Sequence, residues 1–250
     1  VMRQWDKVET FLSPKSPASS KFVAEMRILS RVRHPCITTV MGAVLHRDHA
    51  LLVIEFMRYG SLQDLYLNEM MELDGDLLHP ILTDIAAGMH FIHSHSPPII
   101  HGDLKAGNVL VDERFRAKVS DFGFSGGEMD GTLFWMAPEV LLGGPATKQS
   151  DAYSFGVVLC ELLSRKPPYE GESATAVMMG VINKDISKRP DVPPDAPTPL
   201  KRMMSKCWSH EPDQRPNFAE IRGLLGGLSP SDFSTRVSRK YVVPAAEAEG

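Results

Sequence analysis

Cysteine is scarce in this sequence. The 250 residues contain three cysteines, Cys36, Cys160 and Cys207, which lie far apart and form no CxxC pair. A disulfide-stabilised scaffold needs an even, closely spaced set of cysteines, and a structural zinc site usually needs paired ligands. The sequence therefore argues against both, and we expect reduced thiols in the core of an intracellular, cytoplasmic protein.

A strong charge of one sign and a long hydrophobic run are also absent. The formal net charge is -4, so the chain lacks the basic field with which proteins bind nucleic acid. The longest apolar run, around residues 155–163, is too short to span a bilayer, and residues 1–30 show no signal-peptide pattern. We therefore expect no nucleic-acid partner and no insertion into a membrane.

Periodicity predicts a helix and a strand pair in the first quarter of the chain. Residues 22–33 place Phe22 and Leu29 on one apolar stripe, as in an amphipathic helix. Residues 38–45 and 50–56 are short, apolar and separated by a polar turn, which is typical of a β-hairpin. The sequence therefore predicts a small part that is rich in strands.

The hydrophobic periodicity of a helix follows the predicted strand pair. Between Asp76 and His95 apolar residues recur every three or four positions, with Pro80 in the expected first turn. This spacing predicts a long amphipathic helix that buries Leu78, Leu82, Ile85, Met89 and Ile92.

The rest of the chain is predicted to be mainly helical. Residues 109–112 and 117–123 indicate a second strand pair, and beyond Gly131 helical segments alternate with connections rich in proline and glycine. Residues 229–250 have little to bury and are expected to be a linker or tail. The fold class predicted from these patterns is α+β.

Four polar residues are spaced so that the second strand pair would bring them together. Asp103, Lys105 and Asn108 lie close in sequence, and Asp121 follows the predicted hairpin. Carboxylate and carboxamide oxygens suit Mg²⁺, and an ammonium group neutralises phosphoryl charge. For any one of these residues taken alone, the alternative is an ordinary solvated turn.

Longer motifs occur in the order found in protein kinases. HGDLKAGN at 101–108 resembles the catalytic loop HRDLKxxN, SDFG at 120–123 resembles the DFG motif, and MAPE at 136–139 resembles APE. Segment 151–163 also resembles the buried kinase helix behind that loop, and segment 210–221 resembles the closing CWxxxPxxRPxF region of kinases. GTLFWMAPE and the QRP segment are most similar to the tyrosine-kinase-like branch of serine/threonine kinases.

The resemblance implies a two-lobed fold and its domain bounds. Residues 1–57 would form a partial, small, β-rich N-lobe with an αC-type helix and the hinge, residues 58–228 a large, mainly α-helical C-lobe, and residues 229–250 a linker. The implied function is transfer of the ATP γ-phosphate to Ser/Thr hydroxyls of protein substrates. The alternative is a kinase-like regulatory or scaffolding module that transfers no phosphate.

Catalytic roles follow residue by residue from the resemblance. Asp103 matches the catalytic base, and Lys105 matches the lysine that balances charge on the transferred phosphoryl group. Asn108 and Asp121 match the ligands of Mg²⁺.

Nucleotide-binding roles follow in the same way. Glu55 and Met57 match hinge residues whose backbone groups bind adenine, after a gatekeeper position at Ile54. Glu25 matches the helix glutamate that pairs with the lysine of a VAIK strand.

The chain has neither a VAIK segment nor a glycine-rich GxGxxG loop. Lys7 could be proposed as the partner of Glu25, but its surroundings do not resemble the strand. We expect instead that Val1 continues a strand whose lysine lies upstream, that residues 1–250 alone are nearly inactive, and that regulatory domains are fused to this one.

Further residues are expected to have structural roles. By the same resemblance, His101 is expected to pack under Phe122 and to bond to Asp151. Glu139 and Arg215 match an ion pair that holds the substrate loop.

Control is expected to differ from that of most regulated kinases. Gly102 replaces the arginine that pairs with a phosphorylated activation loop, so phosphorylation of that loop is not expected to be the switch. The alternative is that Ser125 still acts as a switch, with Lys118 as its cation.

Overall fold

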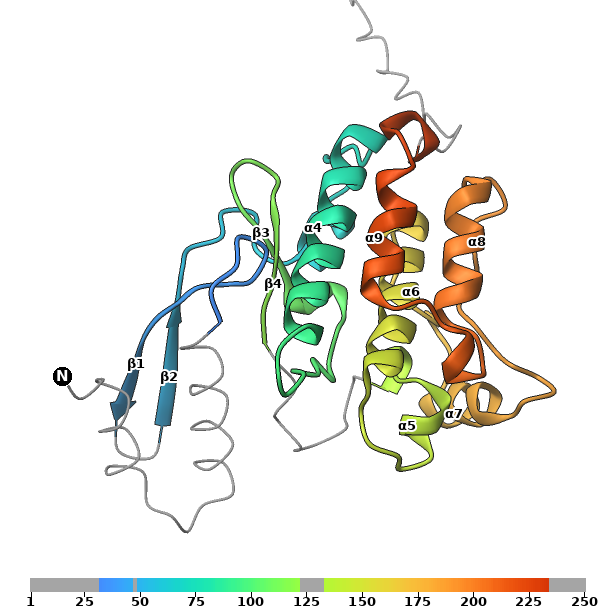
Figure 1. Ribbon diagram of the computed structural model, residues 1–250. Coiled ribbons are helices and arrows are strands. Elements are labelled where there is room, and N and C mark those ends of the chain that lie inside the picture. Colours follow the sequence, from blue (N-terminus) through green and yellow to red (C-terminus); the bar gives the residue numbers. More distant parts are fainter. Residues whose placement is uncertain (1–31, 47–48, 122–132, 234–250) are drawn as a thin grey trace, which may run out of the picture.

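The computed structural model describes residues 32–46, 49–121 and 133–233. The predicted helix at 22–33, with Glu25, lies outside these residues except at its last two positions. Phe122, Ser125 and most of the predicted tail also lie outside them. The described part consists of a β-hairpin beside a larger helical part, with a second short strand pair between them (Figure 1).

The predicted hairpin is confirmed. Strand β1 (Val40–His46) pairs antiparallel with β2 (His49–Ile54), and a register shift between Val40 and Gly42 marks an irregularity at its start. Met41 is 70% exposed on this strand.

The second predicted strand pair is also present. Strand β3 (Val109–Val111) pairs antiparallel with β4 (Ala117–Val119), and both ends of each strand are buried. An isolated bridge joins Val119 to Ile37, so this pair is tied to the chain just before β1. The end of β4 therefore lies between the hairpin and the helical part (Figure 1).

The long predicted helix is α4 (Gly75–His93), and its five predicted apolar positions are all buried. The expected place of Pro80 is wrong, because this proline lies in the second turn. The Asp74 carboxylate accepts a hydrogen bond from the Leu77 amide at 3.0 Å. This cap satisfies an amide that has no partner within the helix, so α4 begins before Asp76.

Helix α6 (Lys148–Ser164) is the buried centre of the helical part. It packs against α8 (Thr198–Cys207), while α4 packs against α9 (Phe218–Gly226) (Figure 1). A side chain at Gly156 would place its Cβ 2.9 Å from that of Cys207, so glycine permits the close approach of α6 and α8. The shorter helices are α3 (Leu62–Leu67), α5 (Pro138–Leu141) and α7 (Ala174–Ile182).

The packed core extends into the segment predicted to be a tail. A short 3₁₀ helix, η5 (Pro230–Phe233), places Phe233 at 1% exposure with its ring 5.1 Å from that of His79. The three cysteines are free and buried, as expected. No helix within the described ranges combines the length and hydropathy that a membrane span requires.

Candidate active site

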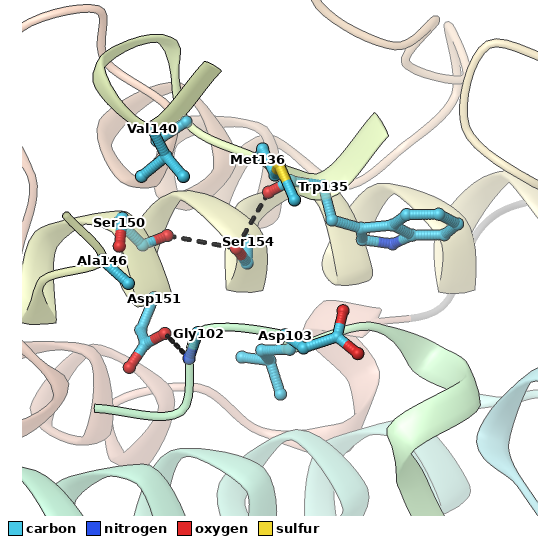
Figure 2. A pocket seen from close by; sticks show the side chains of 11 residues that line it. Gly102, Asp103, Trp135, Met136, Val140, Ala146, Ser150, Asp151 and Ser154 are labelled. Carbon is cyan, nitrogen blue, oxygen red and sulfur yellow. Dashed lines mark hydrogen bonds between the residues drawn. The ribbon is translucent and has the colours of Figure 1, made fainter. Parts of the chain in front are cut away.

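Helix α6 fixes the start of the loop at residues 101–108. The Asp151 carboxylate, 1% exposed, accepts hydrogen bonds at 2.9 Å from the backbone amides of His101 and Gly102. Figure 2 shows the bond to Gly102. The carboxylate also lies 2.8 Å from Nε2 of His93. Gly102 has φ 74°, a left-handed conformation that glycine adopts without strain.

The His101 ring connects this loop to the end of β4. Its Nδ1 accepts a hydrogen bond from the Asp103 amide at 3.2 Å, so Nε2 carries the proton and donates to the Ser120 carbonyl at 3.0 Å. Burial lowers the pKa of His101, which keeps the imidazole neutral. The expected bond between His101 and Asp151 is made through the His101 backbone amide.

Asp103, Lys105 and Asn108 converge as the sequence predicts. The Asp103 Oδ2 atom accepts a hydrogen bond from the Asn108 amide nitrogen at 2.8 Å and lies 3.2 Å from the Lys105 ammonium. The same nitrogen donates to the Asp103 carbonyl at 2.8 Å. The other carboxylate oxygen, Oδ1, is buried and has no hydrogen-bond partner among the described residues.

Asp121 is brought to the same place by the backbone. The amide of Ser120, the residue before it, donates to the Asn108 carbonyl at 2.9 Å. Asp121 itself is exposed and has φ 52°. The strand pair β3–β4 thus carries Asn108 and Asp121 at its open end, next to Asp103.

This donor set could hold a divalent cation together with a bound phosphate. Asn108 uses its amide nitrogen toward Asp103, which leaves its carbonyl oxygen as the available ligand, and Asp121 supplies an exposed carboxylate. Within the described ranges, no three His, Cys, Asp or Glu side chains form a metal site by themselves. Mg²⁺ commonly takes one or two protein ligands plus substrate phosphates, so the residues fit that ion.

The predicted hinge is tied to β4 by a side chain. Glu55 accepts hydrogen bonds from the Thr39 amide at 2.7 Å and from the Lys118 ammonium at 2.6 Å. Burial by itself raises the pKa of Glu55, but these two donors outweigh it and leave the pKa below its usual value.

The hinge backbone retains free hydrogen-bonding groups. Among the described residues, none donates to the Glu55 carbonyl or accepts from the Met57 amide. The Met57 side chain is buried, and Phe56 between the two is 84% exposed. These two backbone groups are therefore available to a ligand with one donor and one acceptor.

The segment at 133–139 faces the loop across a small pocket. Figure 2 shows Asp103 and Gly102 on one side, with Trp135, Met136 and Val140 on the other. The predicted ion pair is present behind this segment, since Arg215 binds both Glu139 oxygens, at 2.6 and 2.8 Å.

Two buried carboxylates were missed by sequence reasoning. Asp84 on α4, 3% exposed, binds Arg116 and the Ala117 amide. Glu161 on α6, 1% exposed, contacts the loop that carries Lys105. An acidic residue on the apolar stripe of a predicted helix was the available signal, but its partners are distant in sequence.

Comparison with known proteins also indicates a protein kinase domain. A family profile described as "Protein tyrosine and serine/threonine kinase" matches residues 11–225. The probable serine/threonine-protein kinase drkC of Dictyostelium discoideum is 38% identical over 81% of this chain and 28% of its own length. The serine/threonine-protein kinase CTR1 of Arabidopsis thaliana is 37% identical over 85% of this chain and 27% of its own length.

A third relative is viral. The putative serine/threonine-protein kinase/receptor R818 of Acanthamoeba polyphaga mimivirus is 36% identical over 84% of this chain and 13% of its own length. The chain thus spans less than a third of each of these relatives. With the profile matching most of the chain and the predicted two-part architecture present, this chain belongs to the protein tyrosine and serine/threonine kinase family.

Proposed function

We propose that this domain transfers the γ-phosphoryl group of ATP to serine and threonine hydroxyls of protein substrates. The observation that carries the proposal is the state of Asp103. One of its carboxylate oxygens is held by Asn108 and Lys105, and the other is buried without a partner among the described residues. A buried acceptor left in this way has a large free-energy incentive to bind a donor.

A substrate hydroxyl is the donor that fits. Bound to Asp103 Oδ1, the hydroxyl oxygen is oriented for attack on the γ-phosphorus, and its proton passes to the carboxylate as the bond to ADP breaks. Lys105, 3.2 Å from Asp103 Oδ2, is close enough for its charge to stabilise the transferred phosphoryl group.

The nucleotide would bind between the hinge and the strand pair. The free backbone groups of Glu55 and Met57 suit the donor and acceptor edge of adenine. Asn108 and Asp121 would hold Mg²⁺, which supplies positive charge to the phosphates when bound. Glu25, proposed to pair with a lysine at the α- and β-phosphates, lies outside the described residues.

The substrate class rests on Lys105 and on the relatives. A lysine two residues after the base favours Ser/Thr over Tyr, and the three relatives are named as serine/threonine kinases. The scaffolding alternative is disfavoured, because a module that transfers no phosphate does not need the four proposed catalytic and metal-binding residues in one place. These residues are Asp103, Lys105, Asn108 and Asp121. We also propose a cytoplasmic location, fused regulatory domains, and domain bounds at 57/58 and 228/229, with packing continuing to Phe233.

The test compares Asp103→Asn with the unaltered full-length protein on serine, threonine and tyrosine peptides. We expect phosphorylation of Ser and Thr peptides, and a loss of about 10²- to 10⁴-fold in Asp103→Asn because the amide cannot accept the proton. Asp185→Asn, a change in an exposed loop, serves as the matched control and should retain full activity. Equal rates for Asp103→Asn and the unaltered protein would refute the proposal.

A further inference from the structure

Helix α6 contains a second carboxylate that the proposed chemistry does not use. Glu161 lies in the apolar C-terminal half of the helix, and its side chain is almost fully buried. Burial of a carboxylate is costly unless hydrogen bonds compensate for the lost water. Its partners therefore indicate what the residue does.

Three donors from three elements converge on Glu161. The Tyr66 hydroxyl of α3 donates to Oε1 at 3.0 Å, and the indole nitrogen of Trp135 donates to Oε2 at 2.7 Å. The backbone amide of Ala106, the residue after Lys105, also donates to Oε2, at 3.4 Å. A single oxygen thus joins the catalytic loop to the segment that leads into Met136.

Helix α6 also holds Trp135 at a second point. Ser154 donates from Oγ to the Trp135 carbonyl at 2.8 Å (Figure 2). Ser154 and Glu161 are 161 − 154 = 7 residues apart, about two helical turns, so they share one face of α6. The ring and the backbone of Trp135 are therefore fixed by the same rigid helix.

The catalytic loop is likewise held at both of its ends. Asp151, near the start of α6, binds the amides of His101 and Gly102, and Glu161, near its end, binds the amide of Ala106. Asp103 lies between these two attachments. The spacing between the base and the Trp135 segment is thus set by one helix.

We propose that Glu161 is a positioning residue that fixes the Lys105 end of the catalytic loop relative to the segment beginning at Trp135. The inference rests on the proposed kinase function and adds a residue that touches neither ATP nor the substrate. Phosphoryl transfer depends on placement of the reacting groups. Loss of the Oε2 hydrogen bonds should therefore impair use of the protein substrate, and leave adenine binding at the hinge intact.

Two substitutions separate hydrogen bonding from charge. In Glu161→Gln, the amide oxygen can accept from Trp135 and Ala106, while its nitrogen donates to the Tyr66 hydroxyl, so all three contacts keep a hydrogen bond and only the Tyr66 bond reverses its direction. In Glu161→Leu, all three donors lose their acceptor at nearly constant volume. Trp135→Phe removes one donor from the opposite side, and Leu162→Ala is a matched control for destabilisation of α6.

The experiment measures kcat and KM in the full-length protein, with ATP and a serine peptide varied separately. We expect Glu161→Leu to lower kcat/KM for the peptide about 30-fold and to change KM for ATP less than about twofold. Glu161→Gln should stay within about threefold of the unaltered protein. The effects of Trp135→Phe and Glu161→Leu should combine to less than their product, because both break one bond.

Amide hydrogen exchange provides a readout that does not need activity. We expect Glu161→Leu, but neither Glu161→Gln nor Leu162→Ala, to speed exchange at 104–108 and 133–137 together. If Glu161→Leu does not fold, Trp135→Phe should show the same exchange pattern. Unchanged exchange there, or peptide kinetics lowered equally by Leu162→Ala, would overturn the inference. If the unaltered protein phosphorylates no peptide, but the variants show the expected exchange pattern, the proposed function is refuted and the positioning role of Glu161 is not.

Discussion

The ammonium group of Lys118 lies 2.6 Å from the carboxylate of Glu55. Lys118 is on β4, three residues before Asp121, and Glu55 is in the hinge. This ion pair connects the strand that carries the proposed metal ligand to the segment proposed to bind adenine. Both side chains are about three-quarters or more buried, so the pair is less screened than one on the surface.

The first prediction concerns this ion pair. Replacing Lys118 by Met leaves Glu55 partly buried without its cation, so we expect a loss of about 1 kcal/mol in the free energy of unfolding at pH 7. Because the pKa of Glu55 is lowered in the folded protein, its stabilisation is present above about pH 4.5 and is lost as the pH falls below that value.

Urea unfolding at pH 7 and pH 4 checks this expectation. The difference between Lys118→Met and the unaltered protein should shrink at the lower pH. Lys166→Met, which removes an exposed pair with Glu170 at 3.9 Å, is the control and should change stability little at either pH. A constant difference for Lys118→Met would contradict the assigned role of Glu55.

The second prediction concerns the pH dependence of stability. Burial raises the pKa of Glu161 to about 7, despite the donors from Trp135, Tyr66 and Ala106 and the nearby charge of Lys105. Cys160, beside Glu161 on α6, and Glu170, near Tyr66, are further titratable groups around this site. A raised pKa means that the stabilisation is full below about pH 4.5 and is lost as the pH rises through 7.

Glu161→Gln cannot titrate, so its stability relative to the unaltered protein should increase as the pH rises from 5 to 8. The rise of the Glu161 pKa from 4.5 to about 7 corresponds to a change of at most about 3 kcal/mol in the free energy of unfolding. Chemical denaturation at several pH values measures it. If the two proteins run parallel across this range, Glu161 does not titrate there.

The third prediction concerns metal and nucleotide. If Asn108 and Asp121 hold Mg²⁺ against the phosphates, ATP with Mg²⁺ should raise the melting temperature, and Asp121→Ala should abolish that rise. Because Asp121 is exposed, the variant should unfold near the same temperature as the unaltered protein without ligand. Asp185→Ala is the control and should keep the ligand-induced rise, whereas a normal rise in Asp121→Ala would rule out this metal site.

The fourth prediction concerns control. Gly102 carries no cation, and Lys118, the alternative partner for a phosphate on Ser125, is already paired with Glu55. We therefore expect phosphatase treatment of the full-length kinase, and Ser125→Ala, to leave its rate within about twofold. A fall of tenfold in both, about 1.4 kcal/mol of barrier, would show that loop phosphorylation is the switch.

Local sequence predicted much of the framework. The spacing of Leu78, Ile85 and Ile92 was sufficient for α4, because a helix that packs on a core repeats its apolar positions. It did not place the start of α4, which depends on the Asp74 side chain. Nor does the apolar character of Met41 reveal that strand β1 leaves this side chain exposed.

The motifs were sufficient to predict which residues gather at the candidate site. Asp103, Lys105 and Asn108 share one short loop, and a hairpin of two short strands returns the chain to Asp121. These are local relationships, set by turn geometry and strand pairing. The order of the motifs along the chain is by itself sufficient to indicate the family.

The amino-acid sequence by itself thus determined the family, the main helices and strands, and the residues proposed for chemistry. Only the tertiary structure decided which buried charges support them. Glu161 is separated in sequence from its partners Tyr66 and Trp135 by 95 and 26 residues. Glu55 is separated from Lys118 by 63 residues. Such partners are chosen by how helices and strands pack, because a carboxylate removed from water is stabilised by whichever donors the fold brings to it.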